Sequence, residues 1–107
     1  MDDATRRAAK DFLDALEPSD ASTRAMFGGY CVYLQGKVVA LVCDGAVFVK
    51  RSAREELLDG LAAPGHAYPG ATQSWRLDPR ALEQPETLRE AVLRIAEALP
   101  PPRRKTP

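Results

Sequence analysis

Residues 30–50, YCVYLQGKVVALVCDGAVFVK, decide the fold because they read as three strands joined by two tight turns. Valine and aromatic residues, which favour strands, dominate the stretch. Asp44-Gly45 is a strong signal for a two-residue hairpin turn, since both central residues need positive φ, and Gln35-Gly36 is a weaker one. The sequence therefore predicts an antiparallel meander of three strands at 30–34, 37–43 and 46–50.

The two turns also predict how the strands pair. Two-residue loops place Leu34 opposite Lys37 and Cys43 opposite Ala46. One face then collects Tyr30, Val32, Leu34, Val39, Leu41, Cys43 and Phe48, and the other collects Cys31, Tyr33, Val38, Ala40, Val42, Val47 and Val49. This register places Cys31 and Cys43 on opposite faces, too far apart for a disulfide.

Both predicted faces are apolar, whereas a sheet with one face in water alternates polar and apolar residues. Helices can cover one face. The other face can be covered by a helix, by the Gly- and Pro-rich loop that follows residue 62, or by a second copy of the chain. We favour a homodimer, because an exposed apolar patch usually marks an interface.

Helical patterns flank the meander and give the fold class. Residues 4–16 carry apolar side chains at helical spacing, and Ser52 with Glu55 has the spacing of a capping box that opens a middle helix. A short strand at 74–77 and a single turn after Asp78-Pro79 precede a last helix from Pro85 to residue 99. We expect a two-layer α+β fold in the order α-β-β-β-α-β-α, with an antiparallel β-meander and N-terminal, middle and C-terminal helices.

The chain has 107 residues, enough for one domain, which we place at residues 1–99. Residues 100–107 are rich in proline and arginine and contain no apolar side chain apart from proline, so we expect a disordered tail. Fifteen basic and fifteen acidic residues give a net charge of zero, which argues against a broad DNA-binding face. The apolar runs are too short to span a membrane and the acidic N-terminus lacks a signal core, so we expect a cytoplasmic protein.

No catalytic or cofactor motif is evident. The run Met26-Phe27-Gly28-Gly29-Tyr30 can bring backbone amides to a ligand, but a bend at a strand entry explains it better, and the phosphate-loop patterns are absent. One histidine, His66, and two cysteines without CxxC spacing do not make a metal site. We therefore expect no enzyme activity, no cofactor and no metal.

Three side chains outside that run are candidates for binding. Trp75 and Arg76 can stack on a base and pair with a phosphate, although Trp75 also suits a core position. Arg24 can bind an anion or a partner carboxylate. The candidate interaction residues are therefore Arg24, Phe27, Gly28, Gly29, Tyr30, Trp75 and Arg76.

Several segments together resemble the N-terminal domain of TfoX/Sxy-type competence regulators. They are RAMFGGY at 24–30, YLQGK at 33–37, ALV at 40–42, VFVK at 47–50, AYPG at 67–70 and WRL at 75–77, followed by the final helix. The resemblance covers residues 4–99 and implies a two-layer antiparallel fold similar to secretion-chaperone-like domains. Cys31 stands where the family often has a small residue such as glycine.

The resemblance also implies a functional direction. The best-known members regulate DNA-uptake genes together with a cyclic-AMP receptor-type activator, and they carry a second, helical domain for which the tail leaves no room. We expect a small regulatory or protein-interaction domain that binds a protein partner, such as a transcription activator or a polymerase subunit. The alternatives are a regulator that contacts DNA through Arg24, Arg76 and the tail, and a small-ligand site around residues 27–31.

Overall fold

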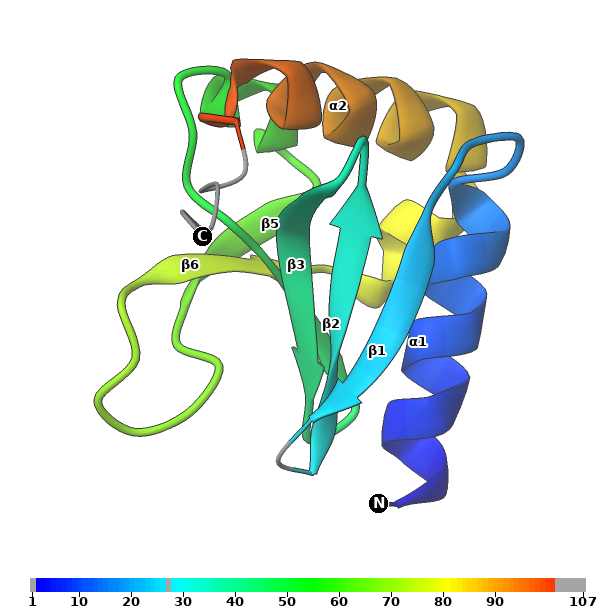
Figure 1. Ribbon diagram of the computed structural model, residues 1–107, viewed down its shortest axis with the longest axis vertical. Coiled ribbons are helices and arrows are strands. Elements are labelled where there is room, and N and C mark those ends of the chain that lie inside the picture. The colour runs from blue at the N-terminus through cyan, green and yellow to red at the C-terminus, as the bar shows by residue number, and fades with distance from the viewer. Residues whose placement is uncertain (1, 27, 102–107) are drawn as a thin grey trace, which may run out of the picture.

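A computed structural model describes residues 2–26 and 28–101, and its centre is one antiparallel sheet (Figure 1). The strands lie in the order β1-β2-β3-β4-β6-β5. They are β1 (Ser22–Met26), β2 (Gly29–Leu34), β3 (Lys37–Cys43), β4 (Ala46–Val49), β5 (Ala62–Gly65) and β6 (Ser74–Leu77). With the helices α1 (Asp3–Ala15) and α2 (Pro85–Ala98), they confirm the predicted α+β class.

The two turns of the meander confirm the predicted pairing beside them. Leu34 pairs with Lys37, and Cys43 pairs with Ala46. Gln35 and Asp44 adopt φ of 56° and 50°, and the glycine that follows each has φ of 75° and 74°. Positive φ at both central residues is the geometry of a two-residue hairpin turn with the right twist.

The predicted faces are wrong beyond the first turn, because the register shifts between Val32 and Tyr33. Val32 pairs with Ala40 instead of Val39, so β3 contributes one extra residue at a bulge. A one-residue shift moves every following side chain to the other face. Cys31 therefore pairs with Leu41 and shares a face with Cys43, which corrects the expectation that the two cysteines lie on opposite faces.

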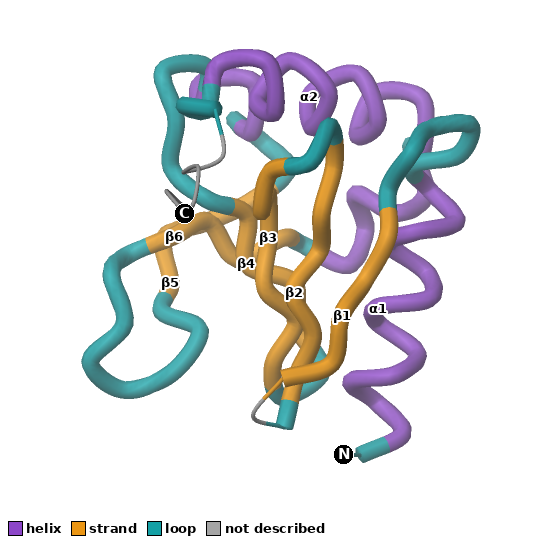
Figure 2. Tube along the Cα trace, viewed as in Figure 1, coloured by secondary structure: helices purple, strands orange, loops and turns teal. Residues whose placement is uncertain are grey.

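Both helices pack on one face of the sheet. The core joins Phe12 of α1 and Ile95 of α2 to Val32, Val42 and Val49, all fully buried. The two helices contact each other and β3, and Figure 2 shows α1 running beside the strands while α2 crosses near their ends. Among the described residues, no helix lies on the opposite face, which we call the open face.

The middle of the chain is less helical than predicted. In place of a middle helix there is one 3-10 turn, η1 (Glu55–Leu58), and Gly60 at φ 79° follows it. The predicted turn after Asp78 is confirmed as η2 (Pro79–Glu83), with the Asp78 carboxylate accepting a hydrogen bond from the Arg80 amide at 2.9 Å.

Two strands, β1 and β5, were not predicted. β1 is an edge strand whose residues are mostly exposed, so it lacks an apolar pattern. β5 contains Pro64, which is tolerated because β5 is the other edge of the sheet.

The described chain ends at residue 101, so most of the predicted disordered tail, residues 102–107, lies outside the described residues. Within residues 2–26 and 28–101, no helix has the length and apolarity needed to cross a membrane.

Candidate functional site

A hollow of about 640 Å³ lies at the end of the open face where β1 turns into β2. Its lining comes from the β1–β2 hairpin, from β3 and its turn, and from the loop between β5 and β6. The lining residues are Met26, Gly28, Gly29, Tyr30, Leu41, Cys43, Asp44, Ala67 and Tyr68. Three of the predicted interaction residues, Gly28, Gly29 and Tyr30, are among them, whereas Phe27 lies outside the described residues.

Glycine is required at positions 28 and 29 for different structural reasons. Gly28 adopts φ of 80°, and a Cβ there would meet no atom within 4 Å, so the position needs glycine for its backbone conformation only. A Cβ on Gly29 would lie 2.3 Å from the Val42 carbonyl oxygen and 3.1 Å from the Cys43 sulfur. Gly29 therefore permits a close approach of β2 to β3.

Two large apolar side chains that line this hollow are exposed. Met26 is 39% exposed and Tyr68 is 56% exposed, and they are the large exposed hydrophobic residues of the described chain. Met26 ends β1, and Tyr68 comes from the β5–β6 loop, 42 positions later in the sequence. Sequence reasoning missed Tyr68 because only the folded loop brings it beside the hairpin.

The two cysteines lie on the open face, Cys43 in the lining of the hollow and Cys31 outside it, and both are free thiols. Cys31 is buried, at 8% exposure, and Cys43 is half-buried. Burial, followed by the negative charge of Asp44 and the neighbouring Cys31, raises the pKa of the Cys43 thiol. A raised pKa reduces the thiolate fraction of the free protein at neutral pH, which disfavours Cys43 as a nucleophile.

The two candidate arginines share the open face but not the hollow. Arg24 pairs with Cys31 on β1, and Arg76 pairs with Phe48 on β6. Neither forms an ion pair with another described side chain. Four strand spacings of about 4.8 Å separate β1 from β6, so the two positions are roughly 19 Å apart.

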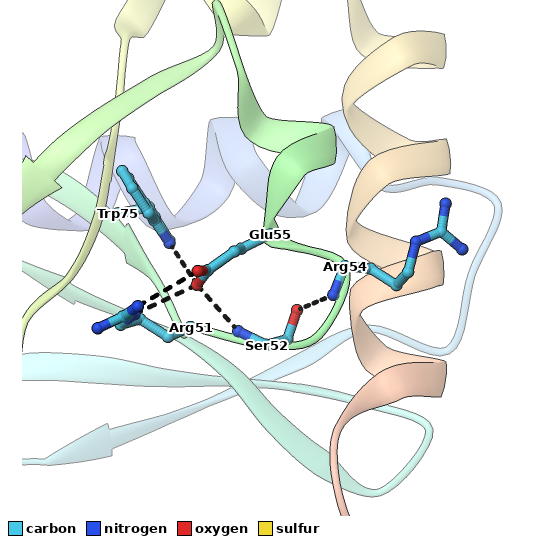
Figure 3. Close-up of polar contacts among 5 residues, drawn as sticks. All are labelled: Arg51, Ser52, Arg54, Glu55 and Trp75. Atoms are coloured by element: carbon cyan, nitrogen blue, oxygen red, sulfur yellow. Dashed lines mark hydrogen bonds and ion pairs between the residues drawn. The ribbon is translucent and has the colours of Figure 1, made fainter.

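Trp75 has a structural role on the helix-covered face of the sheet. It pairs with Val49 and packs against the helix-covered core. Its indole N–H donates to Glu55 Oε1 at 3.0 Å (Figure 3). The same carboxylate accepts from the Arg51 guanidinium at 3.3 Å and from the Ser52 amide at 3.4 Å, so Trp75 ties β6 to the start of η1 and, through Glu55, to the turn before it.

His66 lies in the β5–β6 loop, where its Nδ1 is 2.9 Å from the Ala71 carbonyl oxygen. This contact closes the loop on itself and brings no second functional group to the ring. Across the part of the chain that the structure describes, no cluster of three or more His, Cys, Asp or Glu side chains is arranged to hold a metal ion.

Comparison with known proteins agrees with the resemblance noted in the sequence. Residues 11–98 match the TfoX N-terminal domain. The chain is also 38% identical over 80 residues to an uncharacterized 12.7 kDa protein in the trpE 5′ region of Spirochaeta aurantia, covering 73% of this chain and 67% of that protein. No solved structure matches.

Proposed function

Because the chain belongs to the TfoX N-terminal domain family, we propose that it is a small non-enzymatic regulatory domain that binds a protein partner through its open face. The observation that carries the proposal is the pair Met26 and Tyr68, both exposed and both lining one hollow. An apolar contact surface of this kind, hollowed in the middle, suits an apolar anchor residue of a partner.

The charges around the hollow narrow the partner's chemistry. Arg24 lies on the same face, next to the sheet position of Cys31, and has no ion-pair partner among the described residues. A partner that offers an apolar side chain for the hollow and a carboxylate for Arg24 would satisfy both features. A transcription activator or a polymerase subunit in the cytoplasm is the kind of partner that the family suggests.

The test is affinity capture from nuclease-treated lysate of the source organism, using the wild-type chain and single substitutions. Met26→Glu and Tyr68→Glu add one charge each to the walls of the hollow. Thr87→Glu adds the same charge to an exposed position of α2 and is the matched control. We expect one discrete protein captured by the wild type and the control, with at least tenfold less captured by the two hollow variants.

Other occupants of the face give different results. A homodimer would appear in light scattering of the purified chain, and Met26→Glu and Tyr68→Glu would convert it to a monomer. Direct DNA contact would give a different result: nuclease would remove the captured material. DNA affinity would then fall steeply with salt, and Arg24→Gln and Arg76→Gln would weaken it. Equal capture by all four proteins would refute a role for the hollow.

A further inference from the structure

Three sulfur-bearing side chains surround Gly29 on the open face. Met26 pairs with Gly29 across β1 and β2, and the Cys43 sulfur is 3.1 Å from where a Cβ of Gly29 would stand. Cys31 is two residues further along β2 on the same face, next to Leu41. Since Gly29 has no side chain, β2 places no side chain between the sheet positions of Met26 and Cys43.

We propose that Met26, Cys31 and Cys43 form a binding site for a single Cu(I) ion at the wall of this hollow. Thiolate and thioether sulfur are the soft ligands that select Cu(I) over harder cations. Each cysteine would release its proton to solvent on binding, because the thiolate is the ligand. This proposal goes beyond the partner proposal and needs only the isolated chain.

The spacing of the two cysteines favours a bridging ion over a disulfide. Diagonal neighbours on adjacent antiparallel strands have Cα atoms about 7–8 Å apart. Disulfides usually need Cα atoms about 4.4–6.8 Å apart. An ion bound at about 2.3 Å from each sulfur spans up to roughly 4.6 Å between them, so it can join diagonal positions without moving the strands.

The surroundings fit Cu(I) better than Zn(II). Zn(II) sites normally use four nitrogen, thiolate or carboxylate ligands, and no such cluster occurs within residues 2–26 and 28–101. Both thiols are free, and Cys31 is more than nine-tenths buried, so its side chain is shielded from water. Two thiolates with Cu(I) leave one net negative charge, and Arg24, directly opposite Cys31, is placed to offset it.

The proposed site has an entry from solvent and apolar side chains beside it. Met26 is 39% exposed at the rim, and Leu41 and Ala67 supply apolar walls beside Cys43. An ion can therefore be passed from a soft donor at the rim to the thiols below. Cu(I) transferred in this way would lie among sulfur ligands and apolar side chains, with the buried Cys31 on the side away from solvent.

The experiment titrates Cu(I) under anaerobic conditions against the chromogenic chelator bicinchoninate, with untagged protein. We expect the wild type to remove one Cu(I) per chain from the chelator. Cys31→Ser and Cys43→Ser should each weaken Cu(I) binding at least 100-fold, and Met26→Leu, which keeps the volume, about tenfold. Tyr33→Phe, on the same face without sulfur, is the control and should bind as the wild type does.

Failure of the wild type to compete with the chelator, or wild-type affinity in both serine variants, would overturn the proposal. A second measurement needs no substitution, so it holds even if a serine variant fails to fold. Cu(I) should slow alkylation of Cys43 in the wild-type chain at least tenfold, as read by mass spectrometry, and Zn(II) at the same concentration should not. An unchanged alkylation rate with Cu(I) would equally overturn it.

Discussion

At the residue scale, the two adjacent glycines of the β1–β2 hairpin are required for different reasons, one for its backbone conformation and the other for lack of space. Gly28 needs positive φ in open space, whereas Gly29 is pressed against the backbone of β3. The family resemblance presents the pair as one motif. In the structure each glycine has a different role, and alanine substitution at each position measures how much that role contributes to the free energy of unfolding.

Gly29→Ala should destabilise the fold more than Gly28→Ala does. The new Cβ would lie 2.3 Å from the Val42 carbonyl oxygen, so β2 and β3 must move apart, at a cost of about 2–4 kcal/mol in the free energy of unfolding. Gly28→Ala meets open space and should cost only the left-handed backbone penalty of about 1–2 kcal/mol. Urea denaturation measures both, with Gly70→Ala, at φ 85° in open space, as the control.

Glu55 gives a pH dependence with a defined sign. The hydrogen bonds from Arg51, then Trp75, lower the pKa of the Glu55 carboxyl below its ordinary value (Figure 3). A carboxyl with a lowered folded-state pKa adds stability above its unfolded pKa, and this stability is lost as the pH falls through the folded value.

Glu55→Gln should therefore lower the Tm at pH 7 and bring it closer to the wild type as the pH falls below about 4. Thermal melting from pH 7 to pH 3 measures the difference. Glu83→Gln, at an exposed position outside the described salt bridges, is the control and should show no such convergence. A constant difference between Glu55→Gln and the wild type at every pH would contradict the assignment.

At the element scale, the β2–β3 turn holds the end of α2. The Lys37 ammonium donates to the carbonyl oxygens of Ala96 at 2.7 Å and Leu99 at 2.9 Å. These carbonyls belong to the last turn of α2, where helices leave acceptors without partners and where positive charge is favourable. A residue at the first position of a strand therefore fixes a helix that lies some 60 residues later.

Lys37→Met keeps the length of the side chain and removes the charge and all donors. We expect a loss of about 1.5–3 kcal/mol in the free energy of unfolding, because both hydrogen bonds involve a charged donor. Lys50→Met, on an exposed residue after β4, is the matched control and should change stability by less than about 0.5 kcal/mol. Equal effects of the two substitutions would show that the contact with α2 contributes nothing.

The elements that the sequence could predict are those with local causes. Asp44-Gly45 and Gln35-Gly36 specify their turns through their own backbone preferences, so turns, strands and pairing nearby were predicted. The bulge opposite Val32 leaves Val39 without a register partner on β2 but fully buried in the core, and β1 is a mostly exposed edge strand that pairs with β2. Features with such non-local causes are hard to recognise in a local sequence pattern. One of them, the bulge, places Cys31 and Cys43 on the same face.

At the whole-molecule scale, one layer of helices covers one face of the sheet and leaves the other face open. The core on the helix side accounts for the fully buried side chains, whereas Met26 and Tyr68 remain exposed on the other side. If the open face exists for recognition, its exposed side chains should matter for binding and not for folding.

Tyr68→Glu and Met26→Glu should therefore leave the free energy of unfolding of the isolated chain within about 0.5 kcal/mol of the wild type, because exposed side chains away from the core contribute little. Leu88→Ala, at a fully buried position of α2, should cost about 2–5 kcal/mol and serves as the opposite control. Urea denaturation at low protein concentration gives all four values. Stable variants that lose the captured partner would separate recognition from folding, whereas a large destabilisation by Tyr68→Glu would mean that the β5–β6 loop belongs to the core and that the open face is narrower than the hollow implies.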